Sequence, residues 1–312
     1  MFAELANSLA IAEPCNFRNV TLVPIKSKCG PLSPVAAKSL DDAISDGTLR
    51  ITEVSEQGSV PELRAKNFDE NPVLILDGEE LIGAKQNRIA NVTVLVAAWS
   101  EIVIPVSCIE AGRWDYSRPN FAAAGRVASH KLRARKAEFV TDNLRHRRSR
   151  FSNQSAVWDD VREALHGLGA YSPTAALSDG FKSRADAIDS YLAAFTPQPG
   201  QVGVIYRIDG ILAGLDLFGS EALFARAFAK LLRGCALQAL AGFKTNAATA
   251  MQESDLLDLA LRAPVDTFPG VGIGKERHIR STEIGGGALE LDGGLVHLFA
   301  FPRQSSDGDF AI

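Results

Sequence analysis

Cysteine is scarce in this 312-residue sequence, and no two cysteines form a Cys-x-x-Cys pair. The four are Cys15, Cys29, Cys108 and Cys235. Small disulfide-stapled folds and zinc fingers need paired or closely spaced cysteines, so neither class fits this chain. The cysteine usage predicts a reducing compartment, the cytoplasm.

Long apolar runs are also missing. No stretch approaches the roughly 18 continuous apolar residues of a membrane-spanning helix. The N-terminus, Met1 to Pro14, carries Glu4 and Glu13 and lacks the basic start of a signal peptide. The sequence therefore predicts a cytoplasmic protein with no membrane partner.

Several catalytic signatures are lacking. There is no G-x-x-x-x-G-K-[ST] phosphate loop, no strand-linked G-x-G-x-x-G, no H-E-x-x-H and no serine esterase motif. The five histidines are scattered, so no histidine metal centre is predicted. No cofactor is identified, but an oxygen-ligand Mg²⁺ site remains open, with Glu79, Glu80, Glu110 and Asp216 as its candidates.

What the chain does have is the composition of a folded protein. Its 46% apolar and 22% charged residues argue against disorder, and its length allows a large core. Lys plus Arg number 33 and Asp plus Glu 37, a formal charge of −4. This balance excludes a dedicated polycation and leaves room for a local basic site.

The hydrophobic patterns predict an α+β fold. Mostly antiparallel strands, joined in hairpins with Asp-Gly turns, enclose a basic helical segment near 126–168, and helices follow the third group of strands. Asp77-Gly78, Asp209-Gly210 and Asp292-Gly293 are the predicted turns. Ala97 to Ser100 suggests a further hairpin. We expect an N-terminal extension, 1–18, and one integrated domain, 19–312, with a possible boundary near 196–200, where Pro197 to Gly200 breaks the pattern.

The densest polar cluster is GEELIGAKQNR, from Gly78 to Arg88. Lys85 and Arg88 could bind phosphate or carboxylate, Gln86 and Asn87 could orient a ligand, and Glu79 or Glu80 could act as base or metal ligand. Strand alternation sends Glu80 and Lys85 to opposite faces, so the cluster converges only if Gly83 bends the chain. The alternative is an internal ion-pair network that pins a hairpin.

A second cluster, PVSCIEAGRW, runs from Pro105 to Trp114. Glu110 and Arg113 flank a glycine, and Trp114 could stack on a flat ligand, a combination suited to a nucleotide or sugar phosphate. Cys108 has no histidine nearby, which favours an inert buried thiol over a nucleophile.

Charge is unevenly distributed. Arg113 to Arg150 holds 11 Lys and Arg against three acids, a net charge of +8 in a body of −12. Lys131 to Lys136 is interpreted as a solvated helix face whose cations pair with acids elsewhere. Arg145 to Arg150 is predicted to lie in a basic loop that could be disordered or could attract anions, nucleic acid included.

Both clusters together resemble an uncharacterised prokaryotic family, the domain associated with ADP-ribosylglycohydrolases and the rhodanese-phosphatase superfamily. The blocks that carry the resemblance are Leu76 to Arg88 with Asn91, Ile104 to Glu110 with Gly112 to Trp114, Gln154 to Trp158, Gly200 to Gly203, and Gly214 to Gly219. It covers roughly Thr21 to Phe301, and Ala111 departs from it where a larger polar residue is expected. The family name implies company with ADP-ribose and phosphate chemistry, which is association and not mechanism.

Three hypotheses follow. In the first, the chain binds or processes a nucleotide or ADP-ribose-like phosphorylated ligand. Glu80 or Glu110 is then the general acid/base, Lys85, Arg88 and Arg113 hold phosphate, Gln86 and Asn87 orient the ligand, and Trp114 stacks. In the second, a non-enzymatic module binds nucleic acid through 145–150. In the third, the clusters are structural. Each of the three hypotheses is compatible with a homo-oligomer.

Overall fold

The computed structural model describes residues 2–242 and 251–303. The predicted α+β fold is confirmed, with 32% of the described residues helical, 34% in strands, and mostly antiparallel sheets. The end of the expected domain, 304–312, lies outside the described residues. No helix within the described residues is both long and apolar enough to cross a membrane.

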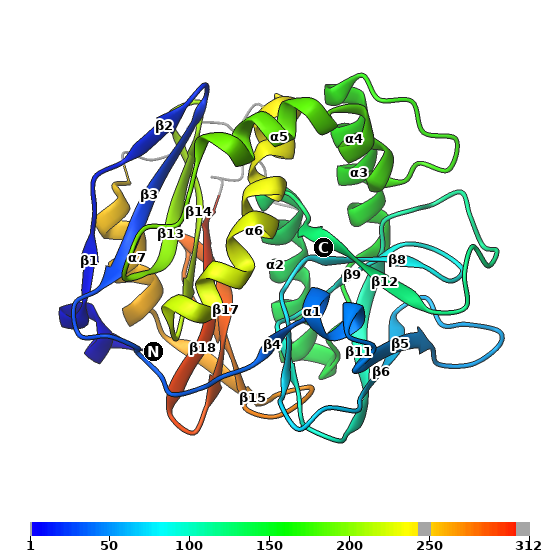
Figure 1. Ribbon diagram of the computed structural model, residues 1–312, viewed down its shortest axis with the longest axis horizontal. Helices are drawn as coiled ribbons and strands as arrows, with labels where there is room; N and C mark the ends of the chain where they lie inside the picture. The colour runs from blue at the N-terminus through cyan, green and yellow to red at the C-terminus, as the bar shows by residue number, and fades with distance from the viewer. Residues whose placement is uncertain (1, 243–250, 304–312) are drawn as a thin grey trace.

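Nine antiparallel strands form the largest sheet, on the left in Figure 1. In spatial order they are β1 (Leu9–Ile11), β3 (Val20–Ser27), β13 (Gln201–Ile208), β14 (Ile211–Phe218), β18 (Gly294–Pro302), β17 (Ile284–Leu291), β16 (Lys275–Ile279) and β15 (Val265–Pro269), with β2 (Cys15–Phe17) also paired to β3. Strands β1 and β2 of this sheet lie within the segment expected as an N-terminal extension. Strand β3 from the first half of the chain pairs directly with β13 from the second half.

Two of the three predicted Asp-Gly turns are hairpins. Asp209-Gly210 joins β13 to β14 and Asp292-Gly293 joins β17 to β18, with positive φ at all four residues, as a type I′ turn requires. The prediction at Asp77-Gly78 is wrong, because the strands on either side of it belong to different sheets. Asp77 instead lies fully buried among cations.

The second sheet has six strands and curls back on itself, since its edge strands β12 and β5 are in contact. Its order is β12 (Phe121–Val127), β8 (Glu79–Gly83), β9 (Arg88–Ala90), β11 (Glu101–Cys108), β6 (Glu62–Asn67) and β5 (Leu49–Glu53). A small sheet of β10 (Val94–Val96), β7 (Val73–Ile75) and β4 (Lys38–Ser39) shares its apolar core. Because β10 pairs with β7 and not with β11, the hairpin expected at Ala97 to Ser100 does not form.

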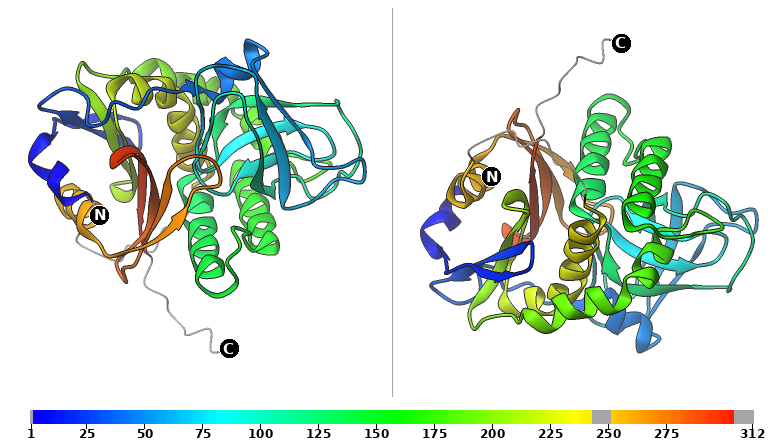
Figure 2. Two further views of the ribbon diagram at one scale, coloured as in Figure 1. Left: turned by 90° about the horizontal axis from the view of Figure 1, so that it is seen from below. Right: turned by 90° about the horizontal axis from the view of Figure 1, so that it is seen from above.

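Most helices lie between the two sheet systems, whereas η1 (Ala3–Ser8) and α7 (Glu253–Arg262) pack on the opposite face of the nine-stranded sheet. The long α6 (Glu221–Ala241) packs against β13 on one side and β12 on the other, as Figures 1 and 2 show. The others are α1 (Leu40–Ser45), α2 (His130–Arg147), α3 (Gln154–Leu168), α4 (Leu177–Ser183) and α5 (Ala185–Ala194). The predicted basic helical segment is thus α2 and α3, and α6 and α7 are the predicted C-terminal helices.

Helix α2 carries a buried ion network between the sheets. Arg133 donates to Asp216 through both terminal nitrogens, at 2.7 and 3.1 Å, and to Asp77 through Nε at 3.1 Å. Lys136 also pairs with Asp77, and all four side chains are fully buried. His297 Nε2 lies 3.0 Å from Asp216 Oδ1. We call this set the Arg133 network. The solvated-face interpretation is therefore wrong at Arg133 and Lys136, although both pair with acids as expected.

The run from Arg145 to Arg150 is not a free loop. Its first three residues form the last turn of α2, where the helix dipole stabilises cations. Arg145 pairs with Asp266, and Arg150 donates to Glu276 at 2.9 Å. Residues 145 to 148 of this run are exposed, and the nucleic-acid hypothesis remains a prediction that depends on them.

Candidate functional site

The first polar cluster is divided between the two faces of the curled sheet. Gly83 (φ 136°) and Ala84 (φ 40°) turn the chain from β8 into β9, so the expected bend is present. Glu80 is opposite Ile89, on the face toward the helices, whereas Arg88 is opposite Leu81, on the face toward the sheet interior. Glu80 and Arg88 consequently cannot contact the same small ligand.

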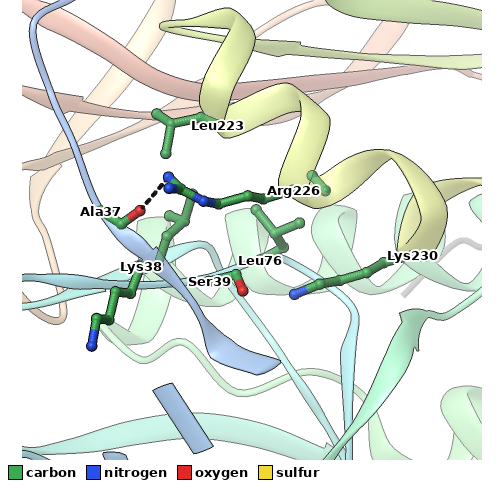
Figure 3. Close-up of a pocket in the computed structure, with 9 residues that line it drawn as sticks. Ala37, Lys38, Ser39, Leu76, Leu223, Arg226 and Lys230 are labelled. Carbon is green, nitrogen blue, oxygen red and sulfur yellow. Dashed lines mark hydrogen bonds between the residues drawn. The ribbon is translucent and has the colours of Figure 1, made fainter. Parts of the chain in front are cut away.

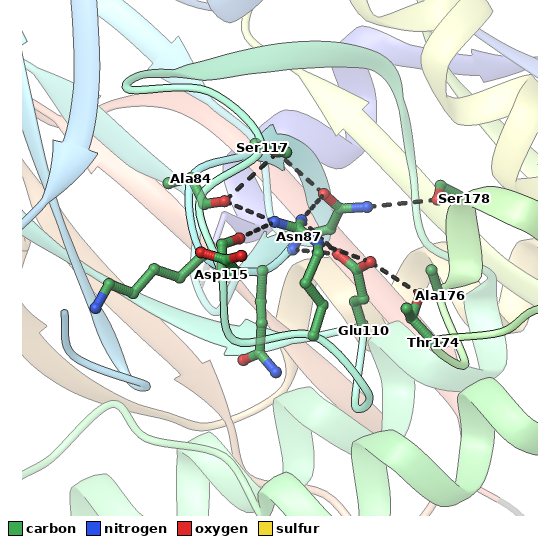
Figure 4. A network of polar contacts seen from close by, with 12 residues as sticks. Ala84, Asn87, Glu110, Asp115, Ser117, Thr174, Ala176 and Ser178 are labelled. Carbon is green, nitrogen blue, oxygen red and sulfur yellow. Dashed lines mark hydrogen bonds and ion pairs between the residues drawn. The ribbon is translucent and has the colours of Figure 1, made fainter. Parts of the chain in front are cut away.

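Arg113 is held by a set of hydrogen bonds at the end of the sheet, shown in Figure 4. Its Nε and one Nη donate to Glu110 at 3.0 and 2.6 Å, and its remaining donors bind Asn87 and the backbone carbonyls of Ala84 and Asp115. A guanidinium has five N–H donors, and all five are used. We call this set the Arg113 clamp. Arg113, expected to hold phosphate, has no donor left to do so.

Glu110 is as fully engaged as Arg113. Besides its two bonds from Arg113, it accepts from the Asn87 backbone N–H at 3.1 Å and from the Thr174 hydroxyl at 2.9 Å. Burial alone would raise the pKa of Glu110, but these donors together hold it below its ordinary value of 4.5. An ionised carboxylate with all its acceptor positions occupied is poorly suited to take a proton, so the geometry favours a positioning role over the expected general acid/base.

Glu79 and Glu80 are consecutive buried residues of β8. Glu80 pairs with Arg126 at 2.5 Å, and Glu79 pairs with Lys230 of α6 at 2.5 Å. Lys230 also pairs with Asp41 and borders a solvent-open hollow of about 250 Å³ between α6 and β4. Figure 3 shows aliphatic side chains together with Lys38, Arg226 and Lys230 in its lining, and the bond from Arg226 to the carbonyl of Ala37. The buried cation of this hollow is already neutralised by two carboxylates, so it offers no free charge to a ligand.

Arg88 differs from these residues because its charge is unpaired. Its side chain is fully buried, yet it makes one hydrogen bond, from Nη1 to Gln86 Oε1 at 3.2 Å. Its Nε and Nη2 have no partner among residues 2–242 and 251–303, and it forms no ion pair there. Burial lowers the pKa of Arg88, while Cys108 and Glu53 act in the opposite direction. A buried guanidinium with free donors is rare, because desolvating a charge is costly unless it is paired.

Several side chains surround the buried Arg88, and we call this set the Arg88 site. Cys108 is the cross-strand partner of Arg88 on β11, and the Trp114 ring centre lies 5.7 Å from the guanidinium carbon. Lys85 Nζ lies 5.4 Å from the same ring and donates to the carbonyl of Gln57 at 2.9 Å. Residues 54–60 therefore form a loop over the site, and we call it the lid loop. The hydroxyl of Tyr116 also contacts it, at 3.4 Å from the carbonyl of Glu56.

Glu53, which sequence reasoning did not single out, also borders the Arg88 site. Its Oε1 accepts from the Lys85 backbone N–H at 3.3 Å, and its buried Oε2 has no hydrogen-bond partner within the described part of the chain. A signal was available. Leu49, Ile51 and Glu53 alternate along β5, so a carboxylate occupies a position that belongs to the apolar face.

The remaining predicted residues are divided between the Arg88 site and the Arg113 clamp. Burial raises the pKa of the Cys108 thiol to about 11, with Arg88 opposing, so its sulfur is protonated at neutral pH. Gln86 supports Arg88, whereas Asn87 belongs to the Arg113 clamp. In the described residues, no group of three or more His, Cys, Asp or Glu is arranged to hold a metal ion.

A comparison with family models places these residues in a known group. The model of the ARG and Rhodanese-Phosphatase-superfamily-associated Protein domain, ARPP-1, matches residues 8–301. The chain belongs to the ARPP-1 family. No curated protein and no solved structure matches it. The ARPP-1 match spans both sheets, and therefore both the Arg88 site and the Arg133 network.

One further ARPP-1 block that the sequence resemblance pointed out has a clear structural role. The side-chain amide of Gln154, at the start of α3, accepts from the Cys108 backbone N–H at 2.9 Å and donates to its carbonyl at 2.7 Å. These two bonds satisfy the backbone N–H and carbonyl of Cys108 at the end of β11, where strand pairing ends. Buried backbone groups need such partners. Gln154 of α3 thus fixes the position of Cys108.

Proposed function

We propose that this ARPP-1 chain binds a nucleotide or ADP-ribose-like phosphorylated ligand at the Arg88 site. The observation that carries the proposal is the fully buried guanidinium of Arg88, with two free donors and no carboxylate paired to it in the described chain. An anion that accepts from Nε and Nη2 would provide the missing charge and both missing hydrogen bonds. These two donors are adjacent on one edge of the guanidinium, which suits two oxygens of a phosphate.

The aromatic wall supports a ligand that is more than a bare anion. Trp114, beside Arg88, and Tyr116, beside Lys85, keep 46% and 48% of their surfaces exposed. Flat groups such as nucleobases stack on such rings, and each stacked base contributes about 1–3 kcal/mol. A ligand with a phosphate at Arg88 and a ring against Trp114 would satisfy both parts of the site.

The predicted site residues then divide into two groups. Arg88 and Trp114 contact the ligand, Gln86 orients the guanidinium, and Lys85 adds positive charge and holds the lid loop. Glu110, Asn87 and Arg113 act as positioning residues, since their polar atoms are used within the protein, and Glu80 is assigned the same role because its Oε2 pairs with Arg126. Because Arg88 is buried, the ligand enters when the lid loop moves away.

Isothermal titration calorimetry tests the proposal. Wild type is titrated with ADP-ribose, ADP and ATP, and each titration is repeated with Arg88→Met. Arg147→Met is the matched control, because Arg147 is an exposed cation at the end of α2. We expect binding by wild type and by the control, and loss of binding in Arg88→Met. Absence of binding to all three ligands in wild type, or unchanged binding in Arg88→Met, contradicts the proposal.

A further inference from the structure

The Arg88 site contains a second buried polar group that lacks a hydrogen-bond partner, the carboxylate of Glu53. We infer that Glu53 is a specificity-determining residue and that the ligand is a phosphorylated ribosyl compound, with a ribose hydroxyl donating to Glu53 and a phosphate accepting from Arg88. This inference rests on the proposed function and makes it more specific.

Three observations place Glu53 and Trp114 at one space. Glu53 Oε2 is buried and lacks a partner among residues 2–242 and 251–303. Gly58 of the lid loop has φ +78°, and a Cβ built on it would lie 3.4 Å from Glu53 Oε2 and 3.4 Å from Trp114 Cζ2. The same point is 3.1 Å from Lys85 Cδ. Because residue 58 is glycine, no side chain of the lid loop stands between the carboxylate of Glu53 and the ring of Trp114.

Arg88 and Glu53 are oppositely charged, and Glu53 raises the pKa of Arg88, but neither satisfies the other's free hydrogen-bonding atoms. Each influences the ionisation of its neighbours at the site, but the two form no ion pair. Arg88 has only donors to offer, and the carboxylate of Glu53 has only acceptors. A group that satisfies both must combine an anionic acceptor with a hydrogen-bond donor nearby. A phosphorylated ribose has this combination, and its nucleobase or second sugar extends it toward Trp114.

Charge argues against the main competing ligand class, a zwitterion with its ammonium on Glu53. Lys85, Arg88 and Glu53 sum to a net charge of +1, so the site favours a ligand that is negative overall. Pyrophosphate meets the charge requirement, but when fully ionised it has no donor for Glu53. The ribose hydroxyls are therefore the part of the ligand that Glu53 would recognise.

The experiment compares ADP, 2′,3′-dideoxy-ADP and inorganic pyrophosphate by calorimetry on wild type and Glu53→Gln. Wild type should bind ADP at least about tenfold more tightly than the dideoxy analogue, which is the loss expected for one charge-assisted hydrogen bond. In Glu53→Gln the ratio of the two affinities, ADP over dideoxy analogue, should fall toward one. Pyrophosphate should bind the variant no more weakly than wild type, because a repelling carboxylate has been removed.

Two further variants make the result decisive. Glu56→Gln, on the exposed part of the lid loop, should leave the ADP ratio as in wild type. Glu53→Asp keeps the charge but withdraws the oxygens by one methylene, so it should also lose the preference for ADP over the dideoxy analogue. This variant serves as the test if Glu53→Gln does not fold. Equal binding of ADP and the dideoxy analogue to wild type overturns the inference and leaves the proposed function standing. Failure of all three ligands to bind wild type instead counts against the proposed function itself.

Discussion

Arg88 and Cys108 occupy directly opposite positions on the antiparallel strands β9 and β11, and both side chains face the interior of the curled sheet. Burial raises the pKa of the Cys108 thiol, so this neighbour brings no negative charge to the guanidinium at neutral pH. Arg88 is thereby left with a neutral partner across the strands and a neutral amide, Gln86, beside it, and the carboxylates of Glu53 and Glu110 act on its charge without an ion pair in the described chain. The protein carries the energetic cost of this arrangement unless an anion is bound.

The first prediction concerns the stability of the protein without ligand. Arg88→Met replaces an unpaired buried charge with an apolar side chain of similar length, so the free energy of unfolding should rise by about 1–3 kcal/mol. Urea denaturation of wild type and variant measures the difference. A loss of several kcal/mol would instead show that Arg88 belongs to a structural network.

Replacing the arginine of the Arg133 network should lower the free energy of unfolding, in contrast to Arg88→Met. Arg133→Met leaves Asp77 and Asp216 buried without their shared guanidinium, so the free energy of unfolding should fall by about 3–5 kcal/mol. The same urea experiment measures it, with Arg88→Met as the paired comparison. Equal stability changes in the two variants would contradict the distinction between a paired and an unpaired buried arginine.

Lys85 should control the opening of the lid loop. Lys85→Met removes the bond to the carbonyl of Gln57, so limited proteolysis should cut within 54–60 several times faster than in wild type. Lys66→Met is the control, since Lys66 pairs with Glu101 at the surface. Hydrogen exchange of the lid loop gives a second readout. Equal cleavage rates in wild type and Lys85→Met would mean that Lys85 does not hold the loop.

Acid sensitivity should identify Glu110 as an ionised member of the Arg113 clamp. Its folded pKa lies below 4.5, so the unfolded state binds more protons as the pH falls toward that value. Its contribution to stability is therefore complete above about pH 4.5 and is lost as the pH drops through the folded pKa. Glu110→Gln should be less stable than wild type at pH 7 by about 1–3 kcal/mol. That gap should narrow below pH 4.5, as measured by urea midpoints from pH 3 to 7, and a constant gap would contradict the assignment.

Local sequence signals predicted the elements whose causes are local. Asp209-Gly210 and Asp292-Gly293 are hairpins because both turn residues take positive φ and the neighbouring strands pair. Asp77-Gly78 carries the same signal, but the side chain of Asp77 is fixed by Arg133 and Lys136, more than 50 residues later in the chain. A two-residue pattern contains no information about such distant partners.

The candidate site was predicted in the same uneven way. Both polar clusters do meet at one end of the curled sheet, and Arg88 and Trp114 lie together as the first hypothesis requires. The sequence could not show that Arg113 would use all its donors, because one of them goes to Asn87 and the clamp also needs Thr174 from a distant loop. Glu53 was within reach, since its position on the apolar face of β5 could be read from the alternation alone.

The Arg133 network has a consequence for how this chain can be divided. A fragment that ends near Pro197 would keep Arg133 and Asp77 but lose Asp216 and His297, and it would leave β3 without β13. The complementary fragment would bury Asp216 with no cation from α2. We therefore expect neither piece to be soluble when expressed alone, and we expect the two to recover a folded protein only when they are produced together.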